Sequence, residues 1–89
     1  MTKPKFFWVL GHQITVSFLP HDPDADQLGE FDAEKKHVTI MDSPNWYATF
    51  LHERVHAILH FSGVGQLLDE KIEEAIVTAI AYGLHPDII

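Results

Sequence analysis

Residues 43–63 read SPNWYATFLHERVHAILHFSG and carry the clearest structural signal in the chain. The apolar side chains in this stretch recur every three or four residues, which is the spacing of one face of an α-helix. They are Trp46, Tyr47, Phe50, Leu51, Val55, Ile58 and Leu59. Ser43 followed by Pro44 is typical of a helix N-cap with proline at the first helical position, and Gly63 is typical of a helix end. The stretch therefore predicts a helix of about four turns.

A second helix is predicted over about residues 67–83. Its apolar side chains repeat at three- and four-residue spacing, and Gly83 with Pro86 beyond it marks the end. The sequence Gly63-Val64-Gly65 between the two helical stretches favours a tight connection. We therefore expect the second helix to pack back on the first as an antiparallel pair.

Strands are predicted before the helices. Residues 5–10 and 13–19 are rich in aromatic and β-branched side chains around a short break, and residues 29–32 and 37–41 flank a polar turn in the same way. Each pair predicts a hairpin. The fold class expected is α+β, with a small antiparallel sheet of three or four strands followed by the helix pair. A length of 89 residues allows one domain, residues 1–89.

Composition limits the function. Six Lys and Arg against 13 Asp and Glu give a net charge of −7, which would repel phosphate backbones and anionic lipid, so no nucleic-acid or membrane partner is expected. No targeting signal is evident, because the apolar run at residues 6–10 is too short. A cytoplasmic protein is expected. With no cysteine and seven histidines, a metal site would have to use His, Asp or Glu.

Residues 52–56, His-Glu-Arg-Val-His, form an H-E-x-x-H motif inside the first predicted helix. One helical turn separates His52 from His56, so both imidazoles can reach a single Zn²⁺ ion. Glu53 lies beside them and is placed to take a proton from a zinc-bound water. The motif predicts zinc held by His52 and His56, with Glu53 as the catalytic base. The alternative is a polar helix face with solvated histidines.

A catalytic zinc normally has three protein ligands, and His60 is not expected to be the third. It lies eight residues after His52, which is about 12 Å along a helix, too far to share one ion. The metzincin pattern is also excluded, because Ser62 and Leu59 stand where that family needs histidine and glycine.

The third ligand is instead expected from the acidic start of the second helix, where Glu70, Glu73 and Glu74 are candidates. If the chain reverses at residues 63–65, Glu73 stands level with His56, Glu74 nearly so, and Glu70 nearer the turn. Glu73 is the first choice and Glu74 the alternative. An acidic first turn that only complements the helix dipole is the competing interpretation for each of the three.

Several stretches together resemble the ImmA/IrrE-like zinc metallopeptidases, a gluzincin-type family, and especially the small versions found in phages and prophages. The stretches are FLHERVHAILH at 50–60, EEAIV at 73–77, AYGL at 81–84 and GEFDAEKKHVTI at 29–40. The resemblance covers about residues 29–84. It implies a small sheet against an active-site helix pair, His52 and His56 as zinc ligands, Glu53 as general base, and a glutamate at 73 or 74 as third ligand. The chain lacks the additional helices of longer members.

The function expected is a zinc-dependent metallopeptidase that hydrolyses a polypeptide substrate. The strand at 37–41 is expected to offer a free edge for that peptide. Tyr82, His60, Tyr47 and His37 are conceivable donors to the developing oxyanion. The alternative is a catalytically silent, zinc-stabilised module of phage or prophage origin that binds a protein partner. A third possibility is a metal-free helix hairpin, and a homodimer is conceivable with a scaffold this small.

Overall fold

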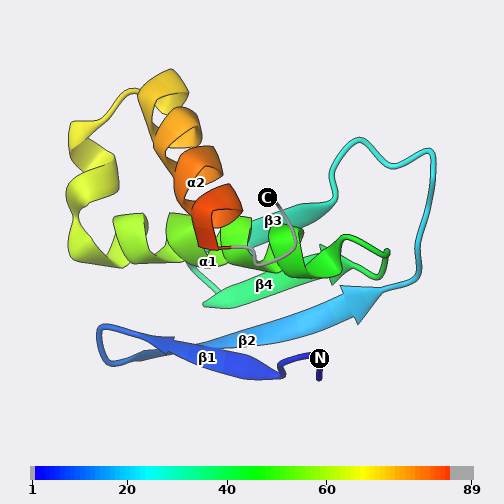
Figure 1. Ribbon diagram of the computed structural model, residues 1–89. Coiled ribbons are helices and arrows are strands. Elements are labelled where there is room, and N and C mark those ends of the chain that lie inside the picture. The colour runs from blue at the N-terminus through cyan, green and yellow to red at the C-terminus, as the bar shows by residue number, and fades with distance from the viewer. Residues whose placement is uncertain (1, 85–89) are drawn as a thin grey trace.

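The computed structural model describes residues 2–84. Within that range the chain forms four strands, two α-helices and one short 3₁₀ helix, and the strands all precede the helices (Figure 1). The elements are β1 (Phe6–Val9), β2 (His12–Leu19), β3 (Gly29–Asp32), β4 (His37–Met41), α1 (Trp46–Ser62), the 3₁₀ helix Val64–Leu67 and α2 (Glu70–Leu84). This order confirms the predicted α+β class, with a sheet first and a helix pair last.

The sheet is mixed, whereas an antiparallel sheet was expected. Its strand order is β1-β2-β4-β3, and β2 pairs with β4 in parallel while the other two pairs are antiparallel. Each strand reverses the direction of the one before it, as the hairpin pattern predicts. The parallel pair arises because β4 inserts between β2 and β3 instead of adding to the outside of β3. One consequence is that β3, not β4, lies at this edge of the sheet.

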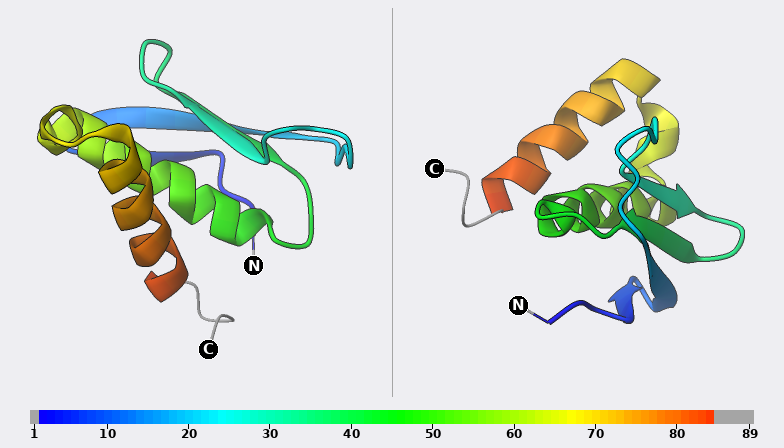
Figure 2. Two further views of the ribbon diagram at one scale, coloured as in Figure 1. Left: turned by 90° about the horizontal axis from the view of Figure 1, so that it is seen from above. Right: turned by 90° about the vertical axis from the view of Figure 1, so that its right-hand side faces the viewer.

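Helix α1 covers one face of the sheet, and α2 lies across the opposite side of α1 (Figures 1 and 2). Side-chain burial alternates along β1 and β2, so that every second side chain faces α1, as expected for strands. The buried side chains of this interface come from three strands and both helices: Phe7, Val9, Ile14, Val38, Ile40, Phe50, Leu51, Ala57 and Ala81. A second cluster, Val55, Leu59 and Val77, joins the two helices.

Both helices begin later than their sequence patterns predict. Helix α1 starts at Trp46 with Asn45 as its N-cap residue and without a side-chain cap, so Ser43 is not the N-cap. Ser43 still contributes a backbone hydrogen bond at the start of the helix, because its carbonyl accepts from the Trp46 N–H. Helix α2 starts at Glu70, where the Asp69 carboxylate accepts a hydrogen bond from the Ile72 N–H. The end of α1 is as predicted, since Gly63 has a positive φ of 83°.

Candidate metal centre

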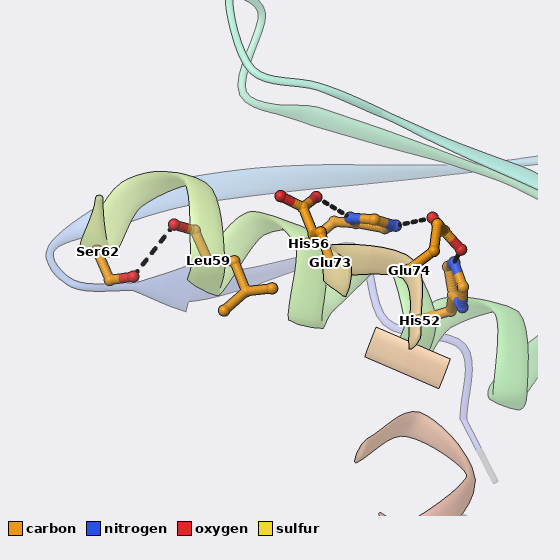
Figure 3. A network of polar contacts seen from close by, with 6 residues as sticks. All are labelled: His52, His56, Leu59, Ser62, Glu73 and Glu74. Carbon is orange, nitrogen blue, oxygen red and sulfur yellow. Dashed lines mark hydrogen bonds and ion pairs between the residues drawn. The ribbon is translucent and has the colours of Figure 1, made fainter. Parts of the chain in front are cut away.

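The H-E-x-x-H motif lies in the middle of α1, on the side that faces α2. His52 and His56 are one helical turn apart, and their rings lie 4.9 Å apart between centroids. Glu74 reaches both histidines from the second turn of α2, with 2.7 Å between its Oε1 and His56 Nε2 and 3.4 Å between its Oε2 and His52 Nε2. Figure 3 shows the three side chains pointing toward one another.

These three residues offer the donor set of a metal site. One potential ligand atom from each of His52, His56 and Glu74 lies within 4.8 Å of the other two, and within residues 2–84 they are the one such group of His, Asp and Glu. Two imidazole nitrogens and a carboxylate oxygen suit a divalent transition metal such as zinc. The geometry therefore agrees with a metal ion between the two helices.

The two glutamates considered as third ligand reach different atoms of His56. Glu74 approaches Nε2, the nitrogen on the side of His52, whereas the Glu73 Oε2 lies 2.8 Å from Nδ1. Glu73 was the first choice from the sequence, and the group described above contains the alternative, Glu74. Glu70, the third candidate, is exposed in the first turn of α2, and it is not a member of that group.

Glu53 lies next to the histidines and is the buried charged residue of the described chain. Its side chain is 8% exposed, and this burial raises its pKa to about 7. The nearby His56 counteracts the rise, whereas the negative charges of Glu74 and Glu30 add to it. A carboxyl group with a pKa near neutrality can both accept and return a proton at physiological pH, which is what general acid–base catalysis requires.

An open cleft of about 1210 Å³ runs over this group of residues. Its floor is α1, and its walls come from the 27–33 segment that contains β3 and from α2. His60, Tyr47 and Tyr82, three of the four conceivable oxyanion donors, line the cleft. The fourth, His37, lies in β4 with its Nδ1 2.6 Å from the Thr15 hydroxyl, and it is not among the lining residues.

Strand β3 passes very close to the H-E-x-x-H motif, and the sequence did not reveal this approach. A Cβ atom added to Gly29 would lie 2.7 Å from Thr49 Cγ2 and 3.2 Å from Glu53 Cγ. Real Cβ atoms essentially never lie as close as 2.7 Å to another heavy atom. The absence of a side chain at Gly29 therefore lets β3 rest directly on α1 beside Glu53.

Replacing Gly29 with alanine should lower the free energy of unfolding by about 1–3 kcal/mol, because the new methyl group overlaps Thr49. Urea denaturation measures the loss. The matched double variant Gly29→Ala/Thr49→Ser removes the opposing Cγ2 atom, so most of the loss should be recovered. Additive losses from the two substitutions would contradict this packing.

The comparisons with known proteins leave the geometry as the basis for assigning a function. No protein-family model matches the chain, and no curated protein or solved structure is significantly similar to it. Across residues 2–84, no helix has the length and apolarity needed to cross a membrane.

Proposed function

We propose that this chain is a zinc-dependent metallopeptidase. The observation that carries the proposal is the position of Glu53: a buried carboxyl group adjacent to a group of two histidines and a glutamate that lines a cleft. A free carboxylate beside a three-residue metal group is the arrangement that metal-assisted hydrolysis uses. The resemblance to the ImmA/IrrE-like peptidases points to the same chemistry.

His52, His56 and Glu74 are the residues proposed to hold the zinc ion. Three protein ligands leave a fourth tetrahedral position for solvent or substrate, which distinguishes a catalytic zinc from a structural one. When bound, zinc supplies Lewis acidity, which lowers the pKa of a coordinated water and polarises a carbonyl group. Zinc is preferred over neighbouring metals because imidazole and carboxylate ligands in a three-residue set are typical of it.

Glu53 is proposed to move the proton. As a carboxylate it accepts a proton from the attacking water, and as a carboxylic acid it returns the proton to the nitrogen of the cleaved bond. Burial raises the pKa of this carboxyl group, whereas a metal cation beside it would favour the charged form. The Glu53 side chain is buried against β3 and lines the cleft.

A polypeptide is the proposed substrate because the cleft is bordered by an unpaired strand edge. Within the described chain β3 pairs with β4 on one side only, and Gly29, Glu30 and Phe31 of β3 line the cleft. An extended peptide can add to such an edge by backbone hydrogen bonds, which would lay its carbonyl groups along the cleft floor. The edge expected from the sequence, residues 37–41, is occupied on both sides by β2 and β3.

A peptide-cleavage assay tests this proposal. The chain is loaded with zinc, incubated with a mixture of unstructured peptides and analysed by mass spectrometry for new termini. We expect cleavage that stops when a chelator removes zinc and resumes when zinc is restored. A preparation with full zinc occupancy that cleaves no peptide in a diverse mixture would contradict the proposal.

A further inference from the structure

The side chain of His56 is held at both of its ring nitrogens by carboxylates from consecutive residues of α2. Its Nδ1 lies 2.8 Å from Glu73 Oε2, and its Nε2 lies 2.7 Å from Glu74 Oε1. Figure 3 shows the ring lying between the two carboxylates. Consecutive helical residues point about 100° apart, which is how neighbours on α2 reach opposite ends of one imidazole.

We propose that Glu73 is a positioning residue that fixes the tautomer and orientation of His56, and that Gly65 provides the space in which the Glu73 carboxylate sits. This inference rests on the proposed metal site. A carboxylate only accepts hydrogen bonds, and both ring nitrogens of His56 face one, so the proposed metal site decides the tautomer: with Nε2 given to the ion, the proton is on Nδ1 and Glu73 accepts it. The lone pair of a neutral ring is then on Nε2, the nitrogen that faces Glu74 and His52.

Glu73 and Glu74 have different surroundings, which match these different roles. The side chain of Glu73 is 27% exposed and that of Glu74 is 51% exposed, while His56 is 17% exposed. The hydrogen bond from His56 to Glu73 is therefore the better shielded of the two, and a shielded charge-assisted bond orients a ring firmly. A carboxylate that accepts a hydrogen bond from the ring nitrogen not bound to the metal is a recurring feature of histidine metal sites.

The backbone around Glu73 is built to keep this carboxylate in place. The Glu73 N–H donates to the Asp69 carbonyl at 2.9 Å in the first turn of α2, and Val77, one turn further on, is fully buried against α1. A Cβ atom added to Gly65 would lie 2.9 Å from Glu73 Oε1. The φ of Gly65 is not positive, so what this glycine offers is room for the Glu73 carboxylate in its present position, not a left-handed backbone conformation.

Zinc affinity, measured by competition with a chromophoric chelator, tests the inference on full-length variants. Glu73→Ala should lower the affinity about 10- to 100-fold, the usual effect of losing such a partner. Glu73→Gln should lose less than Glu73→Ala, because its amide oxygen can still accept the Nδ1 proton. Glu74→Gln should lose more than either, since it removes a proposed ligand. Glu70→Gln, on the exposed side of the same helix turn, is the control and should bind like the parent.

Two further measurements separate positioning from a general structural role. Nitrogen-15 NMR should show His56 of the zinc-loaded parent in one form, with the proton on Nδ1 and Nε2 bound to zinc, whereas zinc-loaded Glu73→Ala should show a mixture of Nε2-bound and Nδ1-bound forms. Gly65→Ala should weaken zinc binding in the parent but not in the Glu73→Ala background, because the atom closest to the added methyl group is the Glu73 carboxylate oxygen that this background lacks.

The outcomes distinguish this inference from the proposed function. A parent chain that binds no zinc would overturn the proposed function and the inference with it. A parent that binds zinc, together with a Glu73→Ala variant that binds equally well, would overturn the inference alone. Loss of zinc in Glu73→Gln as severe as in Glu73→Ala, with binding retained in Glu74→Gln, would show that Glu73 is itself the ligand and would also overturn it.

Discussion

Replacing Glu53 with glutamine should lower the rate of peptide hydrolysis by about 10²- to 10⁴-fold while zinc remains bound, because an amide of the same size cannot take up a proton. The relevant quantities are kcat/KM for a peptide that the parent cleaves and the zinc content of the purified variant. Folding should be preserved, because the substitution removes a buried carboxyl group whose charged form is disfavoured in that environment.

A matched control is Glu34→Gln, which changes an exposed glutamate in the turn between β3 and β4. It alters the net charge in the same way and should leave kcat/KM unchanged. If Glu53→Gln cleaves as fast as the parent, Glu53 is not the base. If the parent and Glu53→Gln both bind zinc but neither cleaves peptides, the chain is better explained as a zinc-stabilised interaction module.

Replacing His56 with alanine should abolish the stabilisation of the fold by zinc. An ion that binds only the folded state adds about 2.7 kcal/mol to the free energy of unfolding at a concentration 100 times its Kd. For a domain of this size that corresponds to a rise in Tm of roughly 10–20 °C. The effect should be large in the parent and nearly absent in the variant, because His56 is a proposed ligand and contacts Glu73 and Glu74 of α2. Thermal unfolding with and without zinc measures it.

His21→Ala is the appropriate control for that experiment. His21 lies exposed in the loop between β2 and β3, so its removal lowers the number of histidines without touching the proposed site. This variant should be stabilised by zinc as much as the parent. Equal stabilisation of His56→Ala and the parent would place the ion elsewhere on the chain.

The parts of the structure that could be predicted from the sequence are those set by short-range periodicity. The apolar spacing in residues 46–62 identified α1, and that helix brings His52 and His56 onto one face because four residues make about one turn. The β1–β2 hairpin followed from two runs of aromatic and β-branched side chains around the short break at Gly11. Each of these features depends on residues close together in the chain.

The features that could not be predicted depend on contacts between distant segments. Turn chemistry predicts that β3 and β4 form a hairpin, but it does not say which of the two lies beside β2, so the parallel pair was missed. The sequence could not determine whether Glu73 or Glu74 joins His52 and His56 in the metal group. These two residues are neighbours on α2, and which one reaches both histidines depends on how the two helices cross. Gly29 and Gly65 look like ordinary strand and turn glycines, and only the folded chain reveals the side chains that approach them.

A crystal structure of the zinc-loaded chain, with diffraction data collected on both sides of the zinc absorption edge, tests most directly whether the two helices hold a metal ion. We expect one anomalous peak per chain, about 2.0–2.2 Å from His52 Nε2, His56 Nε2 and a carboxylate oxygen of Glu74. No zinc peak between α1 and α2, or a peak ligated by other residues, would contradict this expectation.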